Sequence, residues 1–419
     1  MLLSNKAFPI SSSKTTTITI LQHQNRYELI THTNAHAHNL RIHTTAAATT
    51  TTPAASTTTA AMEYRKLGRT GLDVSILSFG SWVSFDYQLG VPEAKAIIKE
   101  AFDHGVNFFD NAEVYAHGAS EEIMGEALKQ LCIPRTDIVI SSKVYFGASK
   151  APKPTAKGLS RKHIVEGVRQ SLARLQLEYL DVVFAHRPDP TTPVEETVRA
   201  FNYVIDQGLA FYWGTSEWPA SAIEEAHSVA ERLGLIPPCA EQPQYSIVHR
   251  KRVEIEYDSL YQRYGTGLTT FSPLACGLLT GKYNTMYNTH GTAAQVPPTG
   301  SRFSVERYKF LADRWLTEDK VKRAQALQPI AQELGCTPAQ LALAWCAANP
   351  HVSTVLTGAT SVEQVQENIK AVEVVRKLTP EVMKRIDDAV LLVSSLAGGN
   401  TATGAMQITN AKELELGKN

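Results

Sequence analysis

The chain of 419 residues is 43% hydrophobic and 20% charged, which is ordinary for a globular protein in water. Its 41 basic and 41 acidic side chains give a formal net charge of zero, which excludes a nucleic-acid binder or a polybasic membrane binder, because both need an excess of positive charge. No uncharged apolar stretch reaches the roughly 18 residues of a membrane-spanning helix, and the five cysteines form no CxxC pair, so we predict no integral membrane protein, no disulfide scaffold and no metal site.

Residues 1–61 differ in composition from the rest of the chain. They contain 15 threonines and five histidines, and their four basic residues against the single acidic residue Glu28 give a formal charge of +3. Because the few large apolar side chains cannot offset the entropy lost on ordering, we expect a disordered extension. Three interpretations remain open: a transit peptide, a dispensable tail, or a misplaced start, since Met62 directly precedes regularly patterned sequence. The remainder is expected to be one domain over residues 62–400 and a flexible C-terminal tail over residues 401–419.

Beyond Met62, short apolar strands alternate with amphipathic helices. A hairpin starts at Tyr64 and turns between Gly68 and Gly71. Strands are predicted at Ile76–Gly80, Asn107–Asp110, Ile138–Lys143, Asp181–His186, Ala210–Gly214, Cys239–Gln242, Gly267–Ser272 and Val352–Leu356. Helices are predicted at Glu93–His104, from Ser120 onward, and at Ser160–Arg174, Pro193–Gln207, Pro219–Leu233, Lys251–Tyr264, Glu318–Leu334 and Ser361–Val375.

These eight strand–helix units extend over about 310 residues, close to the size of a (β/α)8 TIM barrel. We therefore predict an α/β fold: a TIM barrel with an N-terminal hairpin and an extra C-terminal helix. The alternative is a doubly wound sheet, but such a sheet usually carries a Gly-x-Gly-x-x-Gly motif when it binds a dinucleotide, and the chain has none. A long insertion from Lys282 to Trp315 follows the seventh strand, on the side that forms the active face of such a barrel.

Four polar side chains lie at the carboxyl ends of the predicted strands. Asp110 ends the second strand and Tyr115 follows it, Lys143 ends the third, and His186 ends the fourth. An ammonium group near Tyr115 is expected to lower the pKa of the phenol, and a tyrosine tuned in this way can donate a proton to a developing alkoxide. This is the chemistry of carbonyl reduction. A structural Asp110–Lys143 ion pair, a tyrosine that anchors a loop and a core histidine are the alternatives for the individual residues.

From about Tyr64 to Leu392, the sequence resembles the aldo-keto reductase superfamily, and within it the voltage-gated potassium-channel β subunits. The motifs that carry the resemblance are Leu67–Gly71 (LGRTG), Phe109–Tyr115 (FDNAEVY), His186–Pro190 (HRPDP), Glu195–Arg199 (EETVR), Gly214–Trp218 (GTSEW) and Ser272–Gly277 (SPLACG). The resemblance implies a catalytic tetrad of Asp110, Tyr115, Lys143 and His186, with Tyr115 as the proton donor. Animal channel subunits tend to carry Asn at the position of His186, so the resemblance is to plant- or fungus-like relatives.

The resemblance also implies that the barrel binds NADPH or NADP+. The residues that it places at the cofactor are Ser81, Trp82, Gln88, Asp110, Ser216, Gln242, Phe271, Ser272, Pro273, Leu274, Ala275, Cys276, Lys282, Arg302, Gly358, Thr360, Gln364, Glu367 and Asn368. Among these, Lys282 and Arg302 are the cations expected at the 2′-phosphate. Two departures from the pattern are Phe271, where the relatives usually have Trp, and Glu217, where animal channel subunits have Arg.

Two classes of function follow from these residues. The first is an NADPH-dependent reductase of small aldehydes or ketones. The second is a regulatory subunit that binds NADPH with little turnover and docks on a potassium-channel α subunit. A metabolic reductase without a channel partner is a third alternative. The resemblance implies a homo-tetramer in the cytoplasm. Two alternatives for its location are attachment to the plasma membrane through a channel and organellar targeting by residues 1–61.

Overall fold

The structure is a computed structural model that describes residues 17–23, 26–32, 61–82, 85, 89–286, 297, 302–304, 312 and 314–396. The chain divides into two compact units, Met1–Thr57 and Thr58–Asn419. In the first unit, β1 (Thr17–His23) pairs antiparallel with β2 (Arg26–His32), from Thr17 opposite His32 to His23 opposite Arg26.

The disordered extension over residues 1–61 stays a prediction. Within it, β1, β2 and Ala61 are the described residues, and the β-branched residues from Thr17 to Ile20 favour a strand. The rest of the segment, up to Ala60, and the predicted tail over residues 401–419 lie outside the described residues.

The second unit contains a closed barrel of eight parallel strands, which confirms the predicted TIM barrel. The strands are β5 (Leu77–Gly80), β6 (Phe108–Asp110), β7 (Val139–Val144), β8 (Leu180–Ala185), β9 (Ala210–Ser216), β10 (Ala240–Gln242), β11 (Gly267–Thr270) and β12 (Val352–Thr357). They follow one another around the barrel in chain order, and β12 pairs with β5 to close it. All eight carboxyl ends therefore meet at one mouth.

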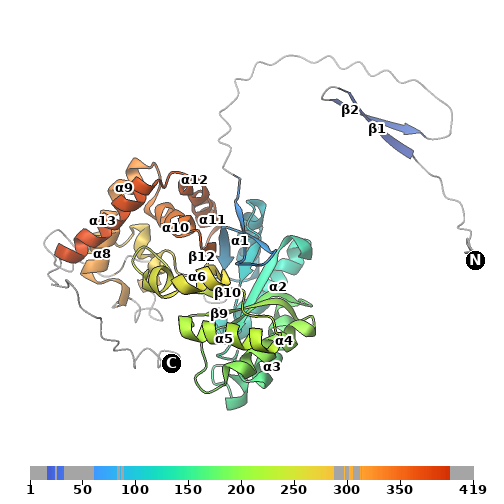
Figure 1. Cartoon of the computed structure of the whole chain (residues 1–419). Helices are drawn as coiled ribbons and strands as arrows, with labels where there is room; N and C mark the ends of the chain where they lie inside the picture. The colour runs from blue at the N-terminus through green and yellow to red at the C-terminus, as the bar shows by residue number, and fades with distance from the viewer. Residues whose placement is uncertain are drawn as a thin grey trace, which may run out of the picture. The chain divides into compact units, whose positions relative to one another are not determined.

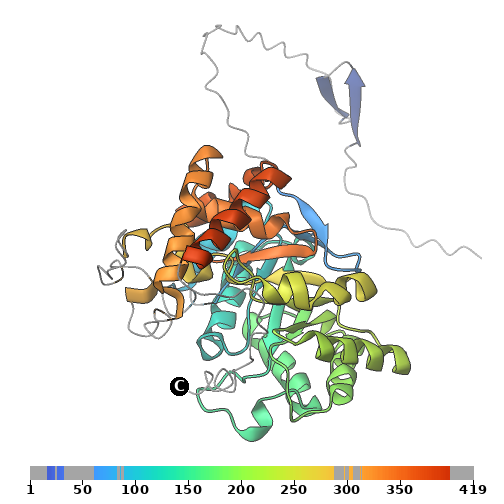
Figure 2. The ribbon, with the colours of Figure 1, turned by 60° about the vertical axis from the view of Figure 1, so that its left-hand side comes forward.

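The predicted hairpin, β3 (Tyr64–Lys66) and β4 (Asp73–Ser75), pairs antiparallel and contacts β12 (Figure 2). Its turn brings Leu67 and Val74 against inward-facing strand residues such as Phe108 and Phe184, so these side chains form one buried cluster. Gly68 has φ +56°, and a Cβ at this position would lie 2.5 Å from the carbonyl oxygen of Cys239. Only glycine therefore fits where the hairpin approaches the strands.

Helices cover the outside of the barrel, as Figure 1 shows. They are α1 (Val91–Asp103), α2 (Ala119–Leu131), α3 (Arg161–Leu175), α4 (Val194–Asp206), α5 (Ala220–Leu233), α6 (Asp258–Tyr264), α10 (Pro338–Ala348) and α11 (Val362–Ile369). In α3, Ile164, Val168 and Leu172 are buried at the predicted helical spacing. Helix α2 begins at Ala119 with Gly118 as its N-cap, so the predicted capping by Ser120 is wrong, because this serine lies inside the helix.

The prediction missed α10 because this helix has no polar face. Every residue from Ala339 to Ala347 is buried, so no amphipathic period marks the segment. Its beginning does carry a signal: the Thr337 hydroxyl accepts a hydrogen bond from the Gln340 backbone N–H, and the Gln340 side chain accepts one from the Thr337 N–H. A capping box followed by an apolar run would have located the helix that links β11 to β12.

Three predicted helices are each divided in two. The segments are Arg252–Glu256, a π-helical turn, before α6; α8 (Glu318–Ala326) before α9 (Gln328–Glu333); and α11 before α12 (Ala371–Val375). The predicted extra C-terminal helix is confirmed as α13 (Pro380–Leu396), which packs against α8 (Figure 2). Short 3₁₀ turns occupy Tyr115–Gly118, Arg135–Asp137, Pro154–Ala156, Ala275–Thr280, Asn284–Met286 and Arg302–Ser304. Within the described part of the chain, no helix is long and apolar enough to cross a bilayer.

Candidate active site at the carboxyl ends of the strands

The barrel brings three of the four predicted catalytic side chains into direct contact. Lys143 Nζ, on β7, forms an ion pair with Asp110 at the end of β6 and donates a hydrogen bond to the Tyr115 hydroxyl at 3.2 Å. It also donates to the Asn111 carbonyl oxygen at 2.7 Å. Lys143 is 0% exposed and Asp110 is 3% exposed, so the ion pair is shielded from water. A buried ammonium with three acceptors is held in one position.

His186, directly after β8, completes the predicted group. Its ring lies edge-on to the Tyr115 ring, with centroids 5.9 Å apart, and edge-on to Phe146, with centroids 5.1 Å apart. Its Nδ1 atom is buried, and no hydrogen-bond partner for it occurs among the described residues. Other buried polar atoms of the described residues, such as the Thr266 and Ser246 hydroxyls, also lack a partner, so the functional interest of this nitrogen comes from its place beside Tyr115.

The electrostatics keep Tyr115 and His186 neutral at neutral pH. Burial raises the pKa of the Tyr115 phenol by more than the Lys143 ammonium lowers it, so the expected net lowering of this pKa is wrong. Burial, with help from the Arg187 and Lys143 charges, lowers the pKa of His186 well below its ordinary value of 6.5. For Lys143, burial lowers the pKa, but Asp110 and Tyr115 together raise it. The site thus combines a protonated phenol, a neutral imidazole and a charged ammonium.

Two further side chains hold Asp110 in place. The Ser141 hydroxyl and the Gln242 Nε2 group donate hydrogen bonds to Asp110 Oδ1 at 2.7 and 3.1 Å. Gln242 was predicted as a cofactor residue, but Ser141 was not predicted at all. Because Ser141 lies two residues before Lys143 on β7, the strand period places both on one face, and this signal could have identified it.

Strained backbone conformations surround the same mouth. Non-glycine residues with positive φ in the described chain are Ala116, His117, Cys132, Gln176, Glu217, Ser272, Ala275 and Cys276. Cys132 and Gln176 end helices, where this conformation is common. The others directly follow Tyr115 or Ser216, or lie in the predicted cofactor segment. Such conformations cost about 1–3 kcal/mol each and cluster at functional sites, yet they leave no sequence pattern.

The predicted carboxamide-binding residues also meet at the mouth. Ser216, at the end of β9, lies opposite Gln242 of β10, and its hydroxyl donates to the Gln242 carbonyl oxygen at 2.9 Å. The Ser81 backbone N–H and hydroxyl both donate to the Asp110 carbonyl oxygen at 3.1 Å. Trp82 is 40% exposed. Gln88 lies outside the described residues.

The predicted cofactor segment from Phe271 to Cys276 has an unusual backbone. Leu274 has φ −92° and ψ 9°, and the following Ala275 and Cys276 have positive φ. The turn is closed by its own hydrogen bonds, from the Ala275 N–H to the Ser272 carbonyl oxygen and from the Gly277 N–H to the Leu274 carbonyl oxygen, each at 2.9 Å. A Cβ built on Gly277 would lie 3.0 Å from Lys282 Nζ, so the predicted phosphate-binding lysine lies against this segment. The side chain of Arg302 is outside the described part of the structure.

The predicted adenosine-binding residues lie after β12 and along α11, from Gly358 before the helix to Asn368 in its last turn. Gln364 Oε1 accepts hydrogen bonds from the Thr360 N–H at 2.9 Å and the Thr360 hydroxyl at 3.3 Å. Asn368 Nδ2 donates to the Gly358 carbonyl oxygen at 3.4 Å. Glu367 Oε1 accepts from the Thr337 hydroxyl at 3.1 Å. Their role at a cofactor stays a prediction.

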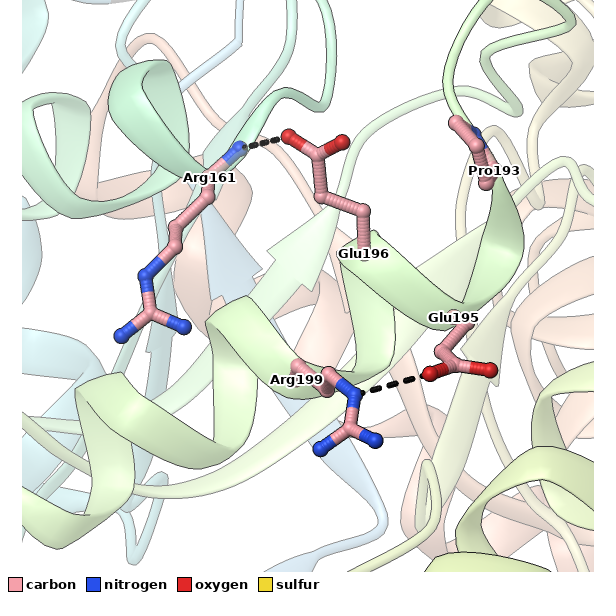
Figure 3. Close-up of a pocket in the computed structure, with 5 residues that line it drawn as sticks. All are labelled: Arg161, Pro193, Glu195, Glu196 and Arg199. Carbon is pink, nitrogen blue, oxygen red and sulfur yellow. Dashed lines mark hydrogen bonds and ion pairs between the residues drawn. The ribbon is translucent and has the colours of Figure 1, made fainter.

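A surface hollow elsewhere on the barrel carries no comparable chemistry. Figure 3 shows its lining residues, Arg161, Pro193, Glu195, Glu196 and Arg199, at the first turns of α3 and α4. Glu196 accepts a hydrogen bond from the Arg161 backbone N–H, and Arg199 Nε pairs with Glu195, each at 2.9 Å. Glu195 is thus paired with an arginine, and the Arg161 guanidinium lies over the Tyr203 ring, 4.7 Å from its centre. Within the described ranges no group of His, Cys, Asp and Glu side chains is arranged to hold a metal ion.

Comparisons with known proteins identify the family of this chain. The model of the aldo/keto reductase family matches residues 76–391. An Arabidopsis thaliana protein named "Probable voltage-gated potassium channel subunit beta" is 56% identical over 329 residues, which cover 78% of this chain and 97% of the relative. A protein of the same name from Oryza sativa subsp. japonica has the same identity and coverage. The family match, the barrel and the buried Asp110–Lys143–Tyr115 contacts lead to one conclusion: this chain belongs to the aldo/keto reductase family, a family of oxidoreductases.

Proposed function

We propose that this chain reduces aldehydes and ketones with NADPH, and that Tyr115 is the proton donor. One observation carries the proposal: the Tyr115 hydroxyl is bound by a buried ammonium, which is itself held by a buried carboxylate. An ammonium with no acidic partner would lose its proton more readily in this environment. Asp110 therefore keeps Lys143 charged, and Lys143 in turn acts on the phenol.

The residues of the mouth supply the proton side of the reaction. Bound NADPH would supply a hydride to the carbonyl carbon. Tyr115 donates its proton to the carbonyl oxygen, and the Lys143 ammonium stabilises the tyrosinate that remains until solvent returns a proton. The neutral His186 imidazole is suited to donate a hydrogen bond to the same oxygen, because it keeps one N–H without adding a charge.

The proposed cofactor is NADPH rather than NADH. Lys282 lies beside Gly277 and supplies positive charge next to the segment from Phe271 to Cys276, which is the proposed site of the cofactor phosphates. The sequence resemblance adds Arg302 as a partner for the 2′-phosphate. Ser216 and Gln242, which lie opposite one another on β9 and β10, are the proposed partners of the nicotinamide carboxamide.

Tyr115→Phe tests the proposed mechanism. We expect kcat for aldehyde reduction to fall about 10²–10⁴-fold, because the general acid is lost, while the dissociation constant for NADPH changes less than about twofold, since the ring remains. Tyr145→Phe is the matched control, because it removes a second phenol near the mouth that does not contact Lys143. Wild-type turnover by Tyr115→Phe, with a deuteride isotope effect that shows hydride transfer to be limiting, would contradict the assignment.

A second proposed role is that of a channel regulatory subunit. Its support is the 56% identity to relatives named as probable channel β subunits, over 97% of their length. We propose a homo-tetramer on the cytoplasmic side of a potassium channel, where the reductase site reports the redox state. Affinity capture with the cytoplasmic domain of a channel α subunit distinguishes this role from that of a metabolic reductase without a partner. Capture by a chain that shows no turnover would instead favour a purely regulatory subunit.

A further inference from the structure

Arg187 is a partly buried cation at the mouth that has no acidic partner among the described residues. It directly follows His186, and its Nη1 group donates to the His186 carbonyl oxygen and, at 3.3 Å, to the Ser216 hydroxyl. Several other shielded arginines pair with a carboxylate: Arg135 with Asp181, Arg174 with Glu121, and Arg252 with Glu217. Arg65, which also lacks a carboxylate partner in the described chain, donates to three backbone carbonyl oxygens instead, but it lies on the hairpin and not at the mouth.

Two acidic residues in the loops after β8 and β9, Asp189 and Glu217, are occupied by other partners. The Asp189 carboxylate accepts hydrogen bonds from the Leu159 and Thr191 backbone N–H groups and from two threonine hydroxyls. Glu217 accepts from the Gln244 backbone N–H at 2.6 Å and pairs with Arg252 at 3.1 Å. Within the described ranges, neither of these carboxylates nor any other forms an ion pair with Arg187.

The guanidinium lies close to the reacting groups. Its Cζ atom is 5.9 Å from the centre of the Phe146 ring, and the same ring lies edge-on to His186. After burial, the Arg187 charge is the next contribution that lowers the pKa of His186, and it also lowers that of Tyr115. A substrate whose carbonyl oxygen contacts Tyr115 and His186 can therefore lie against Phe146 and extend toward Arg187.

We propose that Arg187 binds a carboxylate of the substrate, so that this site prefers aldehydes and ketones that carry a carboxylate. The proposal rests on the reductase function proposed above and names its substrate class. A guanidinium binds a carboxylate through two parallel N–H groups, and partial burial strengthens such a charge-assisted pair. Because this contact forms with the bound substrate and with the transition state alike, it should lower KM more than it raises kcat.

The test compares 4-carboxybenzaldehyde with its neutral methyl ester, methyl 4-formylbenzoate. These have similar para substituents, and only the first carries a charge. In wild type we expect the carboxylate to have the higher kcat/KM. Arg187→Met should lower the carboxylate-to-ester ratio of kcat/KM at least about tenfold, mainly through KM, and Arg187→Lys should retain part of the preference. Arg199→Met is the matched control, because it removes one exposed arginine charge on α4 and should leave the ratio unchanged.

Two outcomes overturn the inference. One is an equal ratio in wild type and Arg187→Met. The other is a loss of NADPH affinity in Arg187→Met as large as the loss of carboxylate preference, which would assign Arg187 to the cofactor. If wild type reduces neither aldehyde, the proposed function fails, and calorimetric binding of 4-carboxybenzaldehyde to the full chain decides the inference separately. Binding that disappears in Arg187→Met supports it, whereas absent binding or equal binding contradicts it.

Discussion

Glu241→Gln should remove a pH dependence of stability that a buried carboxyl group produces. Glu241, on β10, is 0% exposed. Its Oε2 accepts a hydrogen bond from the Thr215 hydroxyl at 2.5 Å, and its Oε1 lies 3.2 Å from the Tyr257 hydroxyl. The single Tyr257 hydroxyl proton already has an acceptor, the Trp218 carbonyl oxygen at 2.6 Å. The Tyr257 hydroxyl thus faces two acceptors, and a protonated Glu241 relieves this competition because it donates to the Tyr257 oxygen in place of accepting from it.

The charges around Glu241 agree with a protonated group. Burial, opposed by the Thr215 hydrogen bond and assisted by Glu217, raises the pKa of Glu241 to about 8. Arg252, from the π-helical turn, lowers this pKa, but it is already paired with Glu217. From α6, the phenol of Tyr261 also faces the carboxyl group. The neutral form of Glu241 is thus favoured at neutral pH.

The sign of the effect follows from the protons bound in each state. Between the pKa of about 4.5 expected when unfolded and the native value of about 8, the native state holds one more proton. The contribution of Glu241 to the free energy of unfolding is therefore fully present below pH 4.5. It decreases by about 1.4 kcal/mol per pH unit as the pH rises toward 8. From pH 5 to pH 8 this amounts to about 4 kcal/mol. Gln cannot ionise, and it keeps both an N–H donor for Tyr257 and an acceptor for Thr215.

Urea unfolding of both proteins from pH 5 to pH 9 measures this effect. The free energy of unfolding of the Gln variant minus that of wild type should rise from near zero at pH 5 and level off above pH 8. This difference cancels the contributions of other groups, such as His227, whose pKa is lowered to about 4. Glu256→Gln, which changes a more exposed carboxylate, is the control. A difference that stays constant with pH, or a variant less stable than wild type at pH 8, would show that native Glu241 is ionised and refute the reasoning.

Three further changes test other parts of the molecule. Lys143→Met should lower kcat at least about 100-fold and also lower the melting temperature, because breaking a buried ion pair leaves Asp110 unpaired at a cost of about 3–5 kcal/mol; unchanged kcat and melting temperature would contradict this. Arg302→Ala should weaken NADPH binding much more than NADH binding, and an equal loss for both would remove Arg302 from the phosphate site. Deletion of residues 1–61 should leave cofactor affinity intact and shift the melting temperature by less than about 4 °C, so a larger decrease would show that the segment packs on the barrel.

The barrel could be predicted because its strands and most of its helices differ in hydrophobic period. Short apolar strands alternate with helices such as α3, in which Ile164, Val168 and Leu172 mark one face. The same criterion failed at α10, whose residues from Ala339 to Ala347 are all buried and therefore show no polar face. Periodicity also cannot detect where a helix is interrupted, as between α8 and α9.

The catalytic residues could be predicted for a different reason: parallel strands end at the same mouth. The positions of Asp110, Lys143 and His186 at strand ends were enough to bring them together, without knowledge of any distance. The pKa of Tyr115 could not be predicted in this way, because the balance between burial and a nearby ammonium depends on how fully the hydroxyl is enclosed. Phe146 and Arg187 were missed as site residues because loop conformation, which has no period, directs them to the mouth.

The charges of these residues explain how one mouth can both transfer a proton and select a substrate. Asp110 and Lys143 cancel, and Tyr115 and His186 are neutral at neutral pH, so proton donation by the phenol occurs beside an ion pair with no net charge. Arg187 is then the uncompensated charge of the group. Because it contacts Ser216 and lies near Phe146 rather than bonding to the Tyr115 hydroxyl, it can bind a distant part of the substrate without replacing Lys143 as the partner of the phenol. Substrate selection by charge is thus assigned to Arg187, and support of the proton donor to Lys143. Arg187→Met should therefore change the carboxylate-to-ester ratio of kcat/KM, whereas Lys143→Met should lower kcat.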